Sequence, residues 1–170
     1  MTGENQSEDY LAKNSLGKMP LLELDDGTCI AESAAICRYL EEMNPNPPLM
    51  GQNPLERALV EMWHRRMELE FLIPMITIFL HTGEMWKDRV TQIPQVAETG
   101  ILNVKERMEW LDRELDGKEF ITGEDYTVAD IAAQCAFVMG KAALGLRIAE
   151  DQLNLSNWFT RVSSRPTARA

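Results

Sequence analysis

Two short groups of residues near the N-terminus stand out, and one of them, Glu32-Ser33, could bind an anion. Glu32 and Ser33 stand where a helix is predicted to begin, so a hydroxyl and free backbone N–H groups can converge there on a negative charge. Lys18, Met19 and Pro20 lead into a short apolar run, where the proline restricts the backbone. Taken alone, Ser33 is equally typical of an ordinary helix cap, and Pro20 of an ordinary trans proline at a strand entry.

A β-hairpin followed by a helix is predicted to position both groups. Residues 21–24 and 29–31 are apolar runs, and the Asp26-Gly27 pair between them is typical of a hairpin turn because glycine tolerates a positive φ. Residues 8–14 are expected to form a short helix before the hairpin. After the second apolar run the period becomes helical, and one helix face carries Ile36, Tyr39, Leu40 and Met43.

The proline-rich segment 45–53 is the predicted linker between two domains, because prolines there cannot continue a helix. The rest of the chain is predicted to be helical. A long helix begins at Pro54, runs to about Leu80 and is kinked at Pro74. One face of this helix carries Ala58, Leu59, Met62 and Trp63.

Three further helices are predicted from apolar residues spaced three and four apart. Thr127 and Asp130 form a capping box at the start of the second one, a folding signal to which we assign no chemistry. The apolar faces carry Ile101, Val104, Met108, Leu111 and Leu115 in the first helix, Val128, Ile131, Ala132, Cys135 and Met139 in the second, and Leu155, Trp158, Phe159 and Val162 in the third.

The composition argues against several classes of function. The 170 residues include 27 acidic and 17 basic side chains, and the net charge of −10 disfavours nucleic acids and anionic membrane surfaces as partners. No apolar stretch reaches the roughly 20 residues that span a bilayer, and the polar, acidic start is not a secretory signal. Three cysteines without CxxC spacing are expected to be reduced core residues, and two histidines cannot form a metal site by themselves. We therefore expect a cytoplasmic protein with no metal, no nucleic acid and no membrane partner.

The order of these motifs resembles the cytosolic glutathione S-transferase family, of bacterial type, over essentially the whole chain. Each motif is weak alone, whereas all of them in this order are specific: GKMP at residues 17–20, LELDDGT at 22–28, ESAAICRYL at 32–40, GEDYTVAD at 123–130 and WFTRVSSRP at 158–166. The resemblance implies a mostly α protein. A partial thioredoxin-like α/β domain, formed by a β-hairpin plus a helix, would span residues 1–44. A linker at 45–53 and an all-helical C-terminal domain over 54–170 would follow.

The same resemblance implies that glutathione is the co-substrate and that its thiolate attacks an electrophilic small molecule. Met19, before a cis Pro20, would pair its backbone with the cysteine of glutathione, as in strand addition. Glu32 and Ser33 match the family's acid–hydroxyl pair, which holds the amine and the carboxylate of the γ-glutamyl group. Lys18 is expected to assist the other carboxylate. The resemblance also implies a homodimer.

The sequence departs from the family pattern at its start. The family's thioredoxin-like domain opens with a strand, a helix and a second strand before the Met-Pro turn, and this strand–helix–strand has no counterpart here. The catalytic Tyr, Ser or Cys of the family lies in that part, so the catalytic residue is unknown and we expect weak or no activity from this chain alone. Tyr10 and Ser15 lie in a different segment and are not expected to replace it. The edge of the first predicted strand is expected to be bare.

Two other functions are compatible with the same residues. One is a non-catalytic interaction module with this fold, and the other is a glutathione-dependent isomerase or dehalogenase. A thiol-conjugation assay, combined with retention on immobilised glutathione, separates the first from a transferase. A substrate screen separates the second.

Overall fold

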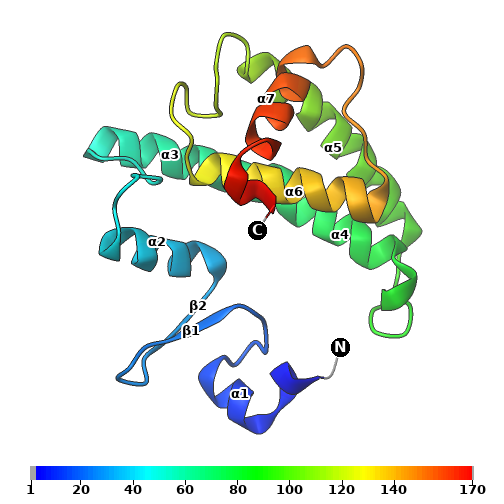
Figure 1. The fold of residues 1–170 in the computed structure, drawn as a ribbon. Helices are drawn as coiled ribbons and strands as arrows, with labels where there is room; N and C mark the ends of the chain where they lie inside the picture. Colours follow the sequence, from blue (N-terminus) through cyan, green and yellow to red (C-terminus); the bar gives the residue numbers. More distant parts are fainter. Residues whose placement is uncertain (1–2, 170) are drawn as a thin grey trace. The chain divides into compact units, whose positions relative to one another are not determined.

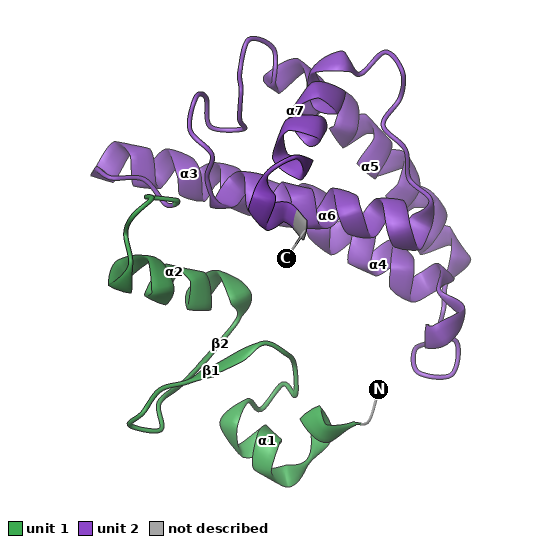
Figure 2. Cartoon of the chain, viewed as in Figure 1, with its two compact units in different colours: residues 1–49 green, residues 50–170 purple. Residues whose placement is uncertain are grey.

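The computed structural model describes residues 3–169 and divides the chain into two compact units, Met1–Leu49 and Met50–Ala170 (Figure 2). The division falls inside the proline-rich segment 45–53, and each unit is described by itself. Within residues 3–169, no helix is both long enough and apolar enough to cross a membrane.

Unit 1, residues 1–49, contains a β-hairpin between two helices in chain order (Figure 1). A 3₁₀ turn (Glu4–Gln6) and helix α1 (Glu8–Lys13) precede strand β1 (Leu21–Glu23), and helix α2 (Ser33–Met43) directly follows strand β2 (Cys29–Ala31). The short first helix, the hairpin and the helix after it are therefore where the sequence predicts them.

The turn between β1 and β2 is fixed by its own polar groups. The strands are antiparallel, with Leu21 opposite Ala31, and Gly27 in the turn has a φ of 84°, as an Asp-Gly hairpin requires. The N–H of Thr28 donates to Oδ1 of Asp26 at 2.9 Å, and this bond holds the pKa of the Asp26 carboxyl below its usual range. Among the described residues the sheet contains only these two strands, so the outer edge of β1 pairs with no further strand.

Unit 2, residues 50–170, is built from helices, and the chain as a whole has the predicted mostly α fold (Figure 1). Its core consists of large, fully buried apolar side chains, among them Met67, Phe71, Leu111 and Trp158. The elements in chain order are α3 (Pro54–Met67), a π-helical turn (Glu68–Leu72), α4 (Ile73–Thr82), a 3₁₀ turn (Glu84–Trp86), α5 (Pro94–Glu114), α6 (Val128–Leu144), α7 (Leu153–Ser163) and a last 3₁₀ turn (Pro166–Arg169).

The apolar face predicted for the first long helix is divided in the structure. Trp63 is buried, whereas Ala58, Leu59 and Met62 are exposed, and the buried stripe runs through Val60 instead. α3 carries apolar residues on two sides, and a helical period fits either set. One apolar side of α3 therefore remains uncovered in the single chain.

The predicted kink at Pro74 takes the form of an interruption one turn earlier. The π-helical turn Glu68–Leu72 separates α3 from α4, and Pro74 is the second residue of α4. Proline has no N–H to donate to the carbonyl four residues before it, so the hydrogen-bond ladder is already open in the preceding turn. A wider π turn accommodates that gap.

The apolar stripes predicted for α5 and α7 are confirmed. Of the predicted residues, Val104, Met108 and Leu111 in α5 and Leu155, Trp158 and Val162 in α7 are buried, whereas Ile101 and Phe159 are half-buried. The capping box of α6 is also present, with Thr127 at the N-cap and Asp130 in the first turn. These elements carry strong local signals in the sequence.

The expectation that the cysteines are core residues is wrong. Cys37 and Cys135 are exposed, Cys29 is half-buried, and none of these three described residues forms a disulfide. α6 carries alanines on several sides, so the apolar pattern does not single out its buried face. That face runs through Ala136 and Phe137 and leaves Cys135 outside.

Candidate functional site

The register of the hairpin brings the two predicted groups of site residues to the same end. Because Leu21 pairs with Ala31, the next residues outward, Pro20 and Glu32, both lie at the open end of the hairpin, away from the turn. Ser33 then begins α2 at this end. Residues 18–20 therefore lie beside the start of α2, so one ligand could contact both.

The entry to β1 is exposed and has the cis proline that the family resemblance implies. The peptide bond between Met19 and Pro20 is cis, not the ordinary trans form. Met19 exposes 72% of its surface, and Lys18 and Pro20 are exposed as well. This corner of unit 1 is therefore open to a ligand.

The start of α2 offers backbone donors that no side chain of the N-cap residue occupies. The first intrahelical bond runs from the N–H of Ile36 to the carbonyl of Glu32 at 3.0 Å, so the amides of residues 33–35 have no acceptor within the helix. No acidic residue lies in the first turn of this 11-residue helix, whose dipole leaves its start partly positive. Together with the exposed Ser33 hydroxyl, these amides can bind a carboxylate.

Glu32 has an unusual backbone conformation at this corner. Its φ is 69° and its ψ is 119°, and it is the one non-glycine residue with a positive φ that is found among residues 3–169. Backbone strain of this kind clusters at ligand-binding positions, where the surrounding structure holds it in place. The Glu32 side chain is exposed and makes no capping bond to α2, so its carboxylate can meet a cationic group such as an amine.

Polar side chains before the hairpin hold the backbone at the entry to β1. The hydroxyl of Tyr10 and the side-chain amide of Asn14 both donate to the carbonyl of Lys18, at 2.7 and 2.8 Å. An ion pair of 2.5 Å between Lys13 and Glu23 links α1 to β1, and the carboxylate of Glu23 raises the pKa of Lys13. These contacts fix the main chain that the site presents.

Gly17 is held in the same way and is confined to glycine. Its carbonyl accepts hydrogen bonds from the side-chain amides of Asn5 at 2.6 Å and Gln6 at 3.1 Å. Its φ is 60°, and a Cβ added there would lie 2.5 Å from Nε2 of Gln6. A larger residue would therefore displace the segment that leads into the site.

Sequence reasoning missed the supporting role of this segment. The sequence marks Tyr10 only by its reactive hydroxyl, whereas in the structure this hydroxyl donates to the carbonyl of Lys18. Asn14 was not singled out, although it is buried at the end of α1. A polar residue at the end of a short helix is a weak signal, because the sequence does not show which carbonyl it reaches.

The five predicted site residues all lie in unit 1, and the geometry there suits binding by backbone groups. Within residues 3–169, no group of three or more His, Cys, Asp or Glu side chains is arranged to hold a metal ion. Sγ of Cys29 lies 3.6 Å from the carbonyl of Gly27, at the turn end of the hairpin, and is thus remote from the open end. The arrangement can accept a ligand that has a carboxylate, an amine and an extended backbone.

A partial thioredoxin-like unit followed by a helical unit defines a fold of the glutathione transferase type. Residues 1–43 match the family described as "Glutathione S-transferase, N-terminal domain", and residues 69–166 match "Glutathione S-transferase, C-terminal domain". The chain belongs to the glutathione S-transferase family.

Individual relatives agree with this assignment. Glutathione S-transferase 2 of Saccharomyces cerevisiae is 31% identical over 170 residues, which cover 98% of this chain and 72% of that protein. The crystal structure of a glutathione S-transferase domain-containing protein from Marinobacter aquaeolei VT8 superposes with a TM-score of 0.89 at 34% identity, covering 98% of this chain and 82% of that one. Elongation factor 1-gamma of Rattus norvegicus is 30% identical over 98% of this chain, which spans only 36% of that protein.

Proposed function

We propose that this chain binds glutathione at the open end of its hairpin and is a cytoplasmic glutathione transferase, a class that conjugates the glutathione thiolate to electrophilic small molecules, with weak or no turnover by this chain alone. The observation that carries the proposal is the uncapped start of α2 beside the exposed entry to β1. Glutathione has an amine, two carboxylates and a short peptide backbone, and this corner offers a complementary group for each.

Each part of glutathione has a proposed partner. The backbone of Met19 pairs with the cysteine of glutathione, as a peptide adds to an exposed strand edge. Ser33 and the first amides of α2 bind the γ-glutamyl carboxylate, and Glu32 binds the amine next to it. Lys18 faces the second carboxylate at the other end of the tripeptide.

Activation of the sulfur is a separate step. Conjugation needs the thiolate, so a hydrogen-bond donor or a nearby positive charge must lower the pKa of the glutathione thiol. We assign no residue of this sequence to that role, because the hydroxyl of Tyr10 is bonded to the carbonyl of Lys18. Binding and turnover therefore need separate assays.

Retention on immobilised glutathione tests the binding site. Replacing Ser33 with Ala removes a hydroxyl from the proposed carboxylate site while leaving the helix start intact, so we expect retention to be lost. Ser15→Ala is the matched control, since Ser15 is an exposed serine of the same unit outside the open end of the hairpin. Unchanged retention of the Ser33 variant, or an equal loss in the Ser15 variant, would contradict the proposed site.

We also propose that two copies of the chain pair through an apolar stripe on α3, the π turn and α4. Its residues recur three, four or seven positions apart, which places them along one side of the helical segment. Contiguous exposed apolar surface of this kind is typical of protein interfaces. The stripe residues, each exposed over 36–69% of its surface, are Leu55, Leu59, Met62, Leu69, Ile73 and Ile76.

A second candidate function is a non-catalytic interaction module, and the similarity to elongation factor 1-gamma favours it. Two assays on the same preparation separate the candidates. Retention on glutathione with turnover of an electrophile supports the transferase, and retention without turnover supports binding alone. A folded protein that shows neither activity supports the interaction module.

A further inference from the structure

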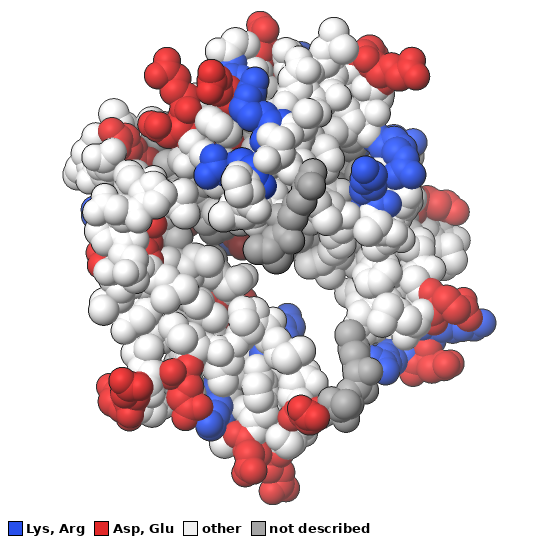
Figure 3. All heavy atoms as spheres, in the orientation of Figure 1, with Lys and Arg blue, Asp and Glu red and all other residues white. Residues whose placement is uncertain are grey.

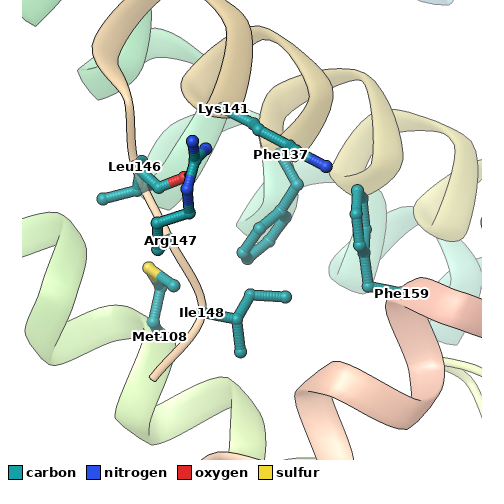
Figure 4. A pocket seen from close by; sticks show the side chains of 7 residues that line it. All are labelled: Met108, Phe137, Lys141, Leu146, Arg147, Ile148 and Phe159. Atoms are coloured by element: carbon teal, nitrogen blue, oxygen red, sulfur yellow. The ribbon is translucent and has the colours of Figure 1, made fainter. Parts of the chain in front are cut away.

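A small apolar cavity lies entirely within unit 2, between α5, α6, α7 and the segment that follows α6. It has a volume of about 170 Å³, and its walls are formed by Met108, Phe137, Ile148 and Phe159. Figure 4 shows the ring of Phe137 in the middle of this group, with Lys141 reaching over it from α6. The rings of Phe137 and Phe159 are tilted neighbours, with centroids 6.0 Å apart and 45° between their planes, so one side of the cavity is aromatic.

The segment after α6 is held in a fixed position beside this cavity. Gly145 ends α6 with a φ of 65°, a conformation that glycine adopts readily, and the N–H of Leu146 donates to the carbonyl of Gly140 at 3.0 Å. Leu146 also packs against Gly140, where a Cβ would lie 3.3 Å from Cδ2 of Leu146. This anchor sets Arg147 and Ile148 at the cavity.

Two cationic side chains, Lys141 and Arg147, line the cavity. Within residues 3–169, neither forms an ion pair with a carboxylate. No acidic residue is found among the described residues that line the cavity. In Figure 3, basic side chains gather over the part of unit 2 where α6 ends. Arg147 donates to the carbonyl of Leu146, at 3.5 Å. In a chain with a net charge of −10, two cations without a carboxylate partner among the described residues, beside an aromatic cavity, point to an anion with an apolar body.

We propose that this cavity binds a small amphipathic carboxylate, with one aromatic ring packed against Phe137, Phe159 and Ile148 and its carboxylate near Lys141 and Arg147. The volume limits the ring to a single one, because an apolar protein cavity of about 150 Å³ holds one benzene molecule. Guanidinium groups bind carboxylates in a planar, two-bonded geometry, which favours a carboxylate over a neutral polar group. This site is independent of the glutathione site, since all of its lining residues belong to unit 2.

The experiment uses 3-phenylpropanoate as the probe and the full chain labelled with ¹⁵N. Saturable shifts of the amide signals are expected at the end of α6 and in residues 145–148, with a Kd of about 0.1–1 mM for a ligand of this size. The neutral analogue 3-phenylpropan-1-ol is expected to bind at least about tenfold more weakly, because it lacks the charge that the cations attract. Raising the salt concentration should weaken the carboxylate and leave the alcohol unchanged.

Matched variants locate the site. Arg147→Ala and Lys141→Ala should each weaken binding about 3- to 10-fold, since both cations are partly solvated. Lys105→Ala is the charge-matched control for Lys141→Ala, because Lys105 lines only a neighbouring cavity of about 330 Å³, Lys141 lines only this one, and Arg147 lines both. Ile148→Phe places a ring in the cavity and should abolish the shifts in a protein that is still folded.

Several results would overturn the proposal. The proposal fails if 3-phenylpropanoate and 3-phenylpropan-1-ol bind with equal affinity, or if Lys105→Ala weakens binding of the acid as much as Lys141→Ala does. It also fails if the shifted amide signals belong mainly to unit 1, or if no saturable shift is seen at about 10 mM 3-phenylpropanoate. Loss of glutathione retention with normal 3-phenylpropanoate binding would refute only the proposed function, so the two proposals fail separately.

Discussion

Asp130 is the residue whose replacement the structure predicts to be most damaging to the fold. It is completely buried at the start of α6, and its two oxygens accept hydrogen bonds from three separate N–H groups. Oδ1 accepts from the backbone of Ile121 at 2.9 Å and from Nε1 of Trp158 at 2.8 Å, and Oδ2 accepts from the backbone of Thr127 at 2.9 Å. One side chain therefore joins the loop before α6, the start of α6 and α7.

The loss of folding stability on replacing Asp130 can be estimated from these three N–H donors. A buried donor that loses its acceptor costs about 1–3 kcal/mol, so Asp130→Ala should cost about 3–9 kcal/mol. That is comparable with the whole stability of a domain, about 5–15 kcal/mol, and we expect this variant not to fold cooperatively. Asp130→Asn keeps one acceptor but turns an NH₂ group toward N–H donors, so its cost should be about 2–4 kcal/mol. Burial raises the pKa of Asp130, and the N–H donors oppose this shift.

Urea unfolding of Asp130→Asn, followed by tryptophan fluorescence and circular dichroism, measures this cost as a lower midpoint with an unchanged slope. Asp125→Asn is the matched control, because Asp125 is exposed five residues earlier, and its effect should stay within about 0.5 kcal/mol. Trp158→Phe removes one donor and should cost about 1–2 kcal/mol. An Asp130→Asn variant within about 1 kcal/mol of the wild type would refute the reasoning that the three N–H groups depend on this carboxylate.

Three further predictions concern the proposed glutathione site and the proposed pairing of two chains. Gly17→Ala should destabilise unit 1 by about 1–3 kcal/mol and lower glutathione retention, because the new Cβ would lie 2.5 Å from the side-chain amide of Gln6 and the φ of residue 17 is positive. Normal retention of this variant would contradict the idea that the segment is held in place. Tyr10→Phe should lower retention about 2- to 5-fold by removing one of two donors to a backbone carbonyl, whereas a loss of turnover without a loss of retention would make Tyr10 catalytic. Ile73→Asp should convert a dimer into a monomer of 19.3 kDa in light scattering, and Val138→Asp, an equally exposed apolar position on α6, should not.

Elements with strong local chemistry were predictable from the sequence. Gly27 specifies the hairpin turn, because its φ of 84° is one that few residues other than glycine adopt. Thr127 and Asp130 specify the start of α6, because the side chain of each residue accepts a hydrogen bond from the backbone N–H of the other. In both cases the decisive interactions span a few residues, so the sequence contains all the information that they need.

The buried faces of α3 and α6 were not predictable in the same way. α3 has apolar residues on two sides, and only the packing of unit 2 decides that Val60 is covered while Leu59 is not. α6 is rich in alanine, so its pattern did not exclude Cys135 from the core. The π turn at Glu68–Leu72 was also missed, because the sequence signals the proline but not where the helix adjusts to it.

The proposed glutathione site could be predicted from the family resemblance but not from the chemistry of its residues. Met19 and Pro20 have no reactive side chains, and Ser33 alone is an ordinary helix-start residue. Their proposed roles depend on backbone groups, whose direction is set by the hairpin register and by the conformation of Glu32. A search for catalytic side chains therefore passes over these positions.

A site made largely of backbone groups also changes which substitutions matter. Met19 exposes 72% of its surface, so many other residues at this position should leave the backbone conformation unchanged. The residues that fix this backbone lie behind it: Asn14 is buried and bonds the carbonyl of Lys18, and Gly17 admits no Cβ. Since the ligand would contact the main chain, the position of the contacting backbone atoms depends on these supporting residues more than on the side chains nearest to the proposed ligand. The supporting segment before β1 is thus as much a part of the proposed binding function as the residues that would touch the ligand.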